Sequence, residues 1–412
     1  MSPSTKIKVI ELYSVSPPPG SVPATSLPLT FLDIPWLPFS PDQPLFFYDF
    51  PISTIQFTQK ILPSLNHSLS FTLQYFFPFS GKLVVPPKPN KPSIVYTEGD
   101  SISVTVVESD GDFSYLSGNS ARKFQDLHCL VPKLPPSELV GDGEKDPLLA
   151  IQITVFPGCG ICMGFALRPV VADGRTFDNF LKMWASFTCK NRGEDLQCLE
   201  ATHDRSVIHD PSGLESTFLK EWWKIKNSEK EGFLHSTRSN FHEMVRSTFV
   251  LGKPEMEKIK KWILTRSEKL YGSKQMLLSP YVLTCAFVWV CWMKTHWPIN
   301  EDSEEVHCFG FVAGGMTRLN YPVPTSYVGN YVAFGRLGTM RKDLMAENGI
   351  VHAAKIIGNT IKKLDGDVLG DAKNWISKWK MLLESELHVT IIGSPKLKFY
   401  SLDFGWGKAQ KN

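Results

Sequence analysis

The stretch Gly164-Phe-Ala-Leu-Arg-Pro-Val-Val-Ala-Asp-Gly-Arg-Thr-Phe177 decides the fold, because it marks the change from a strand to a helix. Residues 149–156 and 161–167 are β-rich and are joined by Pro157-Gly158-Cys159-Gly160, a sequence suited to a tight turn. The two runs should therefore pair antiparallel. The helix that follows near Asp173 is indicated by apolar side chains at i, i+3, i+4 and i+7, namely Phe177, Phe180, Leu181 and Trp184.

Toward the N-terminus, the pattern predicts a short strand over 8–12 and then a proline-rich, loop-rich segment to about residue 51. Apolar residues at helical spacing predict a helix over 54–77. Residues 93–98 and 101–108 alternate as half-buried strands around a Gly99-Asp100 turn, which favours a hairpin.

The second half of the chain opens after a polar stretch over 190–215, which we interpret as the crossover between two domains of similar size. The predicted domains are 1–189 and 216–412. Ser279 and Pro280 suit the start of an apolar helix that runs to about residue 295. The other elements predicted here are strands over 246–251, 306–313 and 397–402 and helices over 253–267, 347–363 and 371–383.

Composition indicates a folded protein that acts on small molecules. Of 412 residues, 42% are apolar, and 44 basic against 41 acidic residues give a net charge of +3, with no basic stripe for nucleic acid. The longest apolar run, 281–293, falls short of the roughly 20 residues that a membrane span needs. No signal-peptide pattern follows Lys6 and Lys8, so we expect a cytoplasmic protein. We also expect a monomer with neither nucleic-acid nor membrane partners.

The common catalytic and cofactor motifs are absent. Gly158, Gly160 and Gly164 nearly match a dinucleotide fingerprint, but they join two strands instead of opening a helix. No phosphate loop, HExxH pair or GxSxG elbow occurs. Cys159 and Cys162 have the spacing of a metal or redox pair but lack a second pair, so we expect no metal.

The corner at 164–177, together with Asp403-Phe-Gly-Trp-Gly407, resembles the plant BAHD family of acyl-CoA-dependent acyltransferases over nearly the whole chain. Residues 279–289 add to the likeness. Residues 322–330 resemble the YFGNC stretch of the anthocyanin and flavonoid-glucoside malonyltransferase branch, with Val328 and Tyr331 in place of its Phe and Cys.

This resemblance implies an α/β, two-domain fold like that of chloramphenicol acetyltransferase, with mixed sheets and a tunnel between the domains. It also implies acyl-CoA, here malonyl-CoA, as co-substrate, no bound cofactor, and a phenolic or flavonoid glucoside as acceptor. By the same resemblance Asp173 is structural, and Asp403, Gly405, Trp406 and Gly407 form a structural motif. Arg168 and Arg175 are candidates for holding a substrate carboxylate, with a structural ion pair or simple exposure as the alternatives.

The main departure from the family is at its general base. The family's HxxxD motif, aligned on Asp173, places its histidine at Pro169. Proline carries no ionisable group and no N–H, so it can neither accept a proton nor donate to an oxyanion. The family's Asp-Cys-Arg stretch is also altered at 314–318, and the C-terminal domain is expected to be truncated after Asp403-Phe-Gly-Trp-Gly407.

Three hypotheses follow. The first is an acyltransferase by descent with weak or absent turnover, a possible pseudoenzyme. The second is a repurposed site for a lyase or cyclisation reaction, in which substrate positioning replaces the lost imidazole. The third is a non-catalytic ligand-binding relic. No other histidine is assigned to the site from sequence alone.

Overall fold

The computed structural model describes residues 6–189, 201–228, 244–272, 275–296, 304–315, 318–385, 387–394 and 396–410. It divides into two compact units, and most of the N-terminal part of the chain lies in unit 1, up to Thr248. Unit 1 also takes Val323–Asn330 and Lys396–Asn412, and unit 2 takes Phe249–Pro322 and Tyr331–Pro395. These units differ from the predicted domains 1–189 and 216–412. Spacing along the sequence does not reveal short segments that return to an earlier unit.

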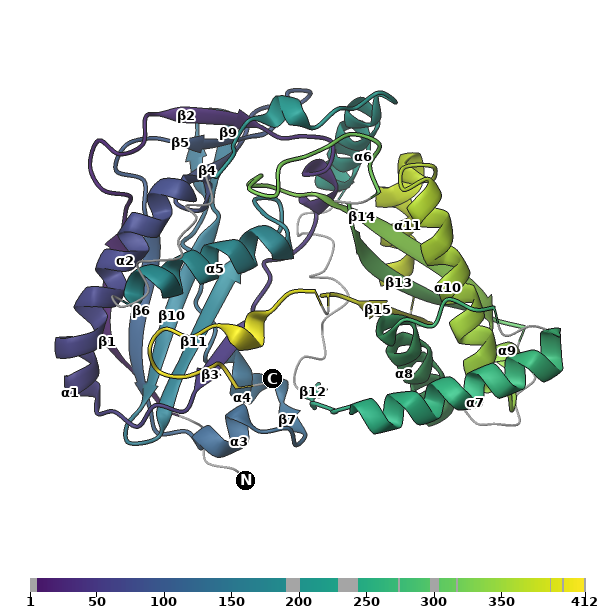
Figure 1. The fold of residues 1–412 in the computed structure, drawn as a ribbon. Helices are drawn as coiled ribbons and strands as arrows, with labels where there is room; N and C mark the ends of the chain where they lie inside the picture. Colours follow the sequence, from purple (N-terminus) through teal and green to yellow (C-terminus); the bar gives the residue numbers. More distant parts are fainter. Residues whose placement is uncertain are drawn as a thin grey trace. The chain divides into compact units, whose positions relative to one another are not determined.

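The central sheet of unit 1 has the order β1-β6-β10-β11-β3. Its strands are β1(Ile7–Val15), β6(Ile102–Ser109), β10(Leu149–Phe156), β11(Gly160–Leu167) and β3(Leu45–Tyr48). Strand β10 runs parallel to β6, whereas the other pairs are antiparallel, so the sheet is mixed. Helices α2(Leu62–Tyr75) and α5(Gly174–Thr188) lie side by side over one face of this sheet (Figure 1).

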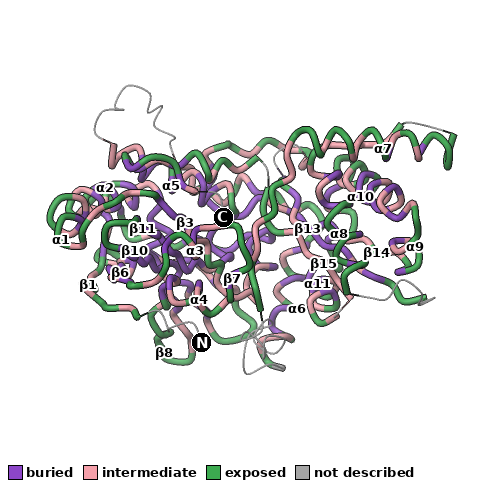
Figure 2. Tube along the Cα trace, turned by 90° about the horizontal axis from the view of Figure 1, so that it is seen from below, coloured by how far each residue is buried: buried purple, intermediate pink, exposed green. Residues whose placement is uncertain are grey.

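The predicted antiparallel pair at the centre of the sheet is confirmed. Strands β10 and β11 pair from Leu149↔Leu167 to Phe156↔Gly160, and every residue of both strands is buried (Figure 2). Gly164 is required by this packing, since a Cβ there would lie 2.1 Å from the Leu130 carbonyl oxygen. The strand pair thus brings the start of α5 to the edge of a rigid core.

The second sheet of unit 1 corrects the predicted hairpin of 93–98 and 101–108. The turn is present, since Asp100 N donates to Thr97 O, but the strands on either side of it enter different sheets. A turn signal fixes where the chain reverses, not which neighbour each strand finds. The order of this sheet is β2(Thr25–Pro28), β5(Ser93–Tyr96), β4(Lys82–Val85), β9(Gly143–Pro147) and β8(Glu138–Val140).

The predicted helix over 54–77 is confirmed as three consecutive pieces. It consists of α1(Thr54–Gln56), the π-helical turn η2(Phe57–Ile61) and α2. Ser53 begins it with a capping box shared with Gln56. The other elements of unit 1 are η1(Ile34–Trp36), η3(Phe77–Phe79), α3(Phe113–Ser117), β7(Arg122–Lys123), α4(Phe124–His128), η4(Arg205–Val207), α6(Leu214–Ser228), β12(Val245–Arg246) and η7(Phe399–Ser401).

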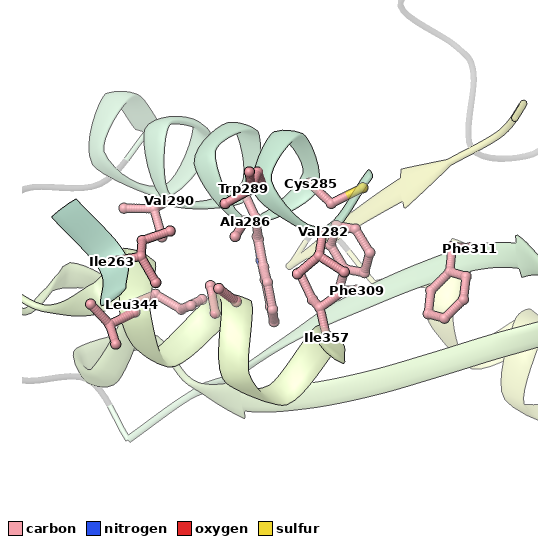
Figure 3. Close-up of a cluster of buried hydrophobic side chains, with 14 of the residues drawn as sticks. Ile263, Val282, Cys285, Ala286, Trp289, Val290, Phe309, Phe311, Leu344 and Ile357 are labelled. Atoms are coloured by element: carbon pink, nitrogen blue, oxygen red, sulfur yellow. The ribbon is translucent and has the colours of Figure 1, made fainter. Parts of the chain in front are cut away.

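Unit 2 is a three-stranded mixed sheet with helices, built around Trp289. The indole projects from α8(Pro280–His296) into a cluster that includes Phe309 and Ile357 (Figure 3). The predicted cap is confirmed, because Val282 N donates to Ser279 Oγ. The unit contains β13(Val306–Gly314), β14(Val332–Met340), β15(His388–Ile391), α7(Lys253–Tyr271), α9(Arg341–Met345), α10(Gly349–Gly366), η6(Ala372–Asn374) and α11(Trp375–Glu384).

Two predicted strands are wrong, and the predicted helices around them are confirmed. Only Val245 and Arg246 pair as a strand, whereas Phe249 and Val250 are exposed, so 246–251 is not one. Residues 397–402 instead contain the 3₁₀ turn η7, and the ring of Phe399 packs against the rings of Phe46 and Phe177. In the described part of the chain, no helix combines the length and apolar character needed to cross a bilayer.

Candidate active site

The strand-to-helix corner is held by Asp173 at the N-cap of α5. Its Oδ1 accepts a hydrogen bond of 2.8 Å from Thr176 N, which satisfies one of the free amides of the first turn. Its Oδ2 lies 3.9 Å from Nη2 of Arg175. The Asp173 side chain is only 3% exposed, so the carboxylate is committed to the helix start.

Pro169 lies buried in the turn that links β11 to this cap. Its carbonyl oxygen accepts a hydrogen bond of 3.0 Å from Asn330 Nδ2, and the carbonyl oxygen of Val170 accepts a second one of the same length. The pyrrolidine ring itself offers neither a lone pair nor a polar hydrogen. The position four residues before Asp173 therefore carries no proton acceptor on its side chain.

Residues 323–330, which we call the strap, dock on this corner. They come from a part of the sequence flanked on both sides by unit 2 but belong to unit 1. Gly329 O accepts hydrogen bonds from Thr176 Oγ1 at 2.9 Å and from Asp173 N at 3.3 Å. Gly329 has φ of +154°, and a Cβ there would lie 2.2 Å from Nη1 of Arg205, so glycine is required.

Both candidate arginines make contacts within unit 1. Arg175 donates from Nη1 to Thr325 O at 2.6 Å and from Nη2 to Tyr327 O at 3.0 Å, so its guanidinium group joins α5 to the strap. Arg168 donates from Nε to Pro147 O, and its Nη2 lies 3.6 Å from Asp146 Oδ1. A role for either arginine in holding a substrate carboxylate stays a prediction.

Arg205 and Asp33 form a buried ion pair that contacts the strap through Tyr327. Arg205 Nη1 lies 3.8 Å from Asp33 Oδ2 and donates to the hydroxyl of Tyr327, and the side chains of Arg205 and Asp33 are 8% and 0% exposed. Burial alone would lower the pKa of Arg205, but the Asp33 carboxylate and the Tyr327 hydroxyl outweigh it and raise that pKa. Nε and Nη2 of Arg205 are buried without a hydrogen-bond partner in the described part of the chain.

Seven of the eight described histidines contact groups other than Pro169, as follows, and the eighth, His209, is exposed. His203 is hydrogen bonded through Nε2 to Tyr75 O, and His307 accepts from Trp289 Nε1. His352 contacts Thr339, and His388 contacts Ser385 O. The rings of His67, His128 and His296 lie against Phe71, Phe124 and Trp292. His235 and His242 lie outside the described residues.

The buried environment of His203 predicts that the protein loses stability in acid. Its Nε2 faces a carbonyl oxygen and therefore carries the proton of the neutral ring, while burial lowers its pKa from 6.5 to about 4. Since the unfolded chain binds this proton first, the stabilising effect is complete above pH 6.5 and is lost as the pH falls toward 4. Urea unfolding at pH 7 and pH 4.5 should show a smaller drop for His203→Phe than for the wild type. Equal drops would contradict this.

The motif at 403–407 packs against the central sheet of unit 1, where Phe404 and Trp406 contact the ring of Tyr48 in β3. Asp403 Oδ1 accepts from Gly405 N at 2.8 Å and Gly407 N at 3.1 Å, which closes the loop on itself. Gly405 and Gly407 adopt φ of +93° and +90°, values that favour glycine. Trp406 then contacts four aromatic rings, those of Tyr48, Phe50, Phe57 and Phe404.

No metal arrangement is found in the described ranges, where no three His, Cys, Asp or Glu side chains gather suitably. The Cys159-Gly-Ile-Cys162 pair belongs to the β10–β11 turn region. Cys159 is exposed, whereas Cys162 is buried, and burial raises the pKa of the Cys162 thiol well above its usual range. The two sulfurs thus lie in contrasting environments.

The sequence did not identify Asn330, Asp33 and Arg205 as the polar residues around the strand-to-helix corner. Asn330 was visible only as part of the 322–330 likeness, and Arg205 lies in the polar stretch interpreted as a crossover. Asp33 followed by Ile34-Pro35-Trp36 was the one available signal, since a carboxylate in an apolar run needs a partner if it is buried.

The model of the Transferase family matches residues 5–410 of this chain. The chain therefore belongs to this family, the BAHD acyl-CoA-dependent acyltransferases, and the resemblance seen in the sequence is confirmed.

Curated relatives agree with this assignment. The chain is 39% identical to coumaroyl-CoA:anthocyanidin 3-O-glucoside-6''-O-coumaroyltransferase 1 of Arabidopsis thaliana, over 98% of this chain and 87% of the relative. It is 37% identical to malonyl-coenzyme A:anthocyanin 3-O-glucoside-6''-O-malonyltransferase of Dahlia pinnata, with the same coverage. It is 34% identical to phenolic glucoside malonyltransferase 1 of Nicotiana tabacum, over 98% of this chain and 88% of that one.

Solved structures confirm the predicted fold class. Vinorine synthase matches with a TM-score of 0.64 at 18% identity, covering 98% of this chain and 87% of that one. TRI101 of F. sporotrichioides, complexed with coenzyme A and T-2, matches with a TM-score of 0.59 at 13% identity, over 94% and 87%. The chain thus has the two-domain, mixed-sheet α/β fold of the chloramphenicol acetyltransferase type.

Proposed function

We propose that this chain is an acyltransferase by descent that transfers an acyl group from acyl-CoA to a hydroxyl of a phenolic or flavonoid glucoside, with weak or absent turnover. Membership of the acyl-CoA-dependent family supports the reaction type, and the glucoside acyltransferases at 34–39% identity support the acceptor class. The observation that carries the weak turnover is the buried Pro169 at the position of the family's general base.

The chemistry explains why this one residue matters. In the family reaction an imidazole removes the proton from the acceptor hydroxyl as its oxygen attacks the thioester carbon, and the CoA thiolate then leaves. General-base assistance of this kind contributes ~10²–10⁴ in rate, equivalent to about 3–5.5 kcal/mol of the barrier. Asp173 is engaged elsewhere, since its Oδ1 accepts from Thr176 N in the first turn of α5 and its Oδ2 lies 3.9 Å from Nη2 of Arg175.

For the donor we propose malonyl-CoA. The likeness of 322–330 to the malonyltransferase branch supports a donor with a free carboxylate. Arg175 adds no support, because its Nη1 and Nη2 donate to the carbonyl oxygens of Thr325 and Tyr327. Coumaroyl-CoA is the competing donor, because the coumaroyltransferase relative has 39% identity against 37% for the malonyltransferase.

The test is a turnover assay with purified protein, malonyl-CoA or coumaroyl-CoA, and a panel of anthocyanidin and phenolic glucosides. We expect ester formation at or near the no-enzyme background, followed by mass spectrometry of products. Rapid ester formation would refute the weak turnover. A product that forms without acyl-CoA would instead favour the lyase or cyclisation hypothesis, and a CoA-dependent rise in melting temperature without any product would favour the ligand-binding hypothesis.

A further inference from the structure

We propose that Asn330 is a positioning residue, which fixes the backbone of residues 169 and 170 so that any side chain at 169 is presented from one defined place. This inference rests on the proposed function, because it concerns the same corner. It goes further in assigning the residue that sets the corner's geometry.

The side-chain nitrogen of Asn330 contacts three acceptors. Its Nδ2 lies 3.0 Å from Pro169 O, 3.0 Å from Val170 O and 3.1 Å from Asp33 Oδ1. All three partners are acceptors only, so the orientation of the amide is defined. Two hydrogens serve three acceptors, which means that at least one hydrogen is shared between two oxygens.

Asp33 holds Asn330 in place. The same Oδ1 also accepts from Asn330 N at 3.2 Å, and Oδ2 accepts from Thr30 N and Thr30 Oγ1 at 2.8 and 2.7 Å. Asn330 is 1% exposed and Asp33 is 0% exposed, so water does not compete for these bonds. The carboxylate therefore fixes the amide, and the amide fixes the turn.

Asn330 holds residues 169 and 170 through their backbone carbonyl oxygens, which every residue type has. Replacing a histidine by proline at 169 changes the ring and removes an N–H, but it leaves the carbonyl that Asn330 binds. The corner can therefore keep its shape without its base. It also follows that a histidine restored at 169 would enter a turn that is already positioned.

Hydrogen exchange measured on variants that keep Pro169 tests whether Asn330 holds the turn, and it requires no enzyme activity. Asn330→Ala removes the bonds to residues 169 and 170 but keeps the backbone bond to Asp33. Thr176→Val is the matched control, since it removes a 2.9 Å bond between α5 and the strap that does not touch residues 169 and 170. We expect Asn330→Ala to speed exchange in a peptide covering 165–175 by about tenfold or more relative to Thr176→Val. Equal exchange in both variants would overturn the proposal.

Kinetics in the Pro169→His background give the functional arm. Loss of positioning should lower kcat ~10–100-fold in Pro169→His/Asn330→Ala with little change in KM, whereas Pro169→His/Thr176→Val should keep its kcat within about threefold. If both double variants lose kcat in proportion to melting temperature, the role of Asn330 is merely structural and the proposal fails. If Pro169→His has no activity at all, the proposed function fails, and the exchange experiment still decides the role of Asn330.

Discussion

Arg205→Met should lower the free energy of unfolding by about 3–5 kcal/mol, because it leaves the Asp33 carboxylate buried and without its cation. Asp33 has no exposed surface, and the Arg205 guanidinium 3.8 Å away is the charge that offsets its desolvation. The substitution also frees the Tyr327 hydroxyl, which accepts from Arg205 Nη1. The measurement is urea unfolding followed by circular dichroism.

Two further variants make this prediction specific to burial. Lys226→Met breaks the ion pair with Glu144, which is shorter at 2.7 Å but has side chains that are 33% and 40% exposed, and it should cost only about 0–1 kcal/mol. Adding Asp33→Asn to Arg205→Met should recover part of the loss, since the buried charge is then gone. A loss in Arg205→Met no larger than in Lys226→Met would show that the buried pair does not stabilise the fold.

The local parts of the fold could be predicted because their signals lie close together in the sequence. The turn at Pro157–Gly160 and the stripe from Phe177 to Trp184 gave the strand pair and α5, and Ser279 gave the start of α8. Each of these depends on contacts between residues a few positions apart. The family resemblance supplied the two-domain fold as a whole.

The surroundings of the corner could not be predicted, because they depend on contacts across long sequence separations. Asn330 lies 297 residues from Asp33 and 161 from Pro169, and no pattern in either segment names the other. The prediction that the strands at 93–96 and 102–109 pair with each other was wrong for the same reason, since the partners of both strands lie in other parts of the chain. The position of Pro169 was readable from sequence, but the hydrogen bonds that hold its carbonyl were not.

Pro169→His should raise kcat/KM for ester formation by ~10²–10⁴. The substitution supplies an imidazole, which can accept a proton, at the position where the family carries its base. The turn is already held through its backbone, since Asn330 Nδ2 contacts the carbonyls of residues 169 and 170, so the new side chain needs little reorganisation. Pro169→Ala is the matched control, because it removes the ring without adding a base, and its turnover should stay at the wild-type level.

The most direct measurement is kcat/KM of the wild type, Pro169→His and Pro169→Ala, prepared side by side and assayed with malonyl-CoA and coumaroyl-CoA on the same glucoside panel. A gain of at least about a hundredfold in Pro169→His alone is the predicted result. A ratio near one with rapid wild-type turnover would contradict the account, since some group other than a residue-169 imidazole would then be taking the proton.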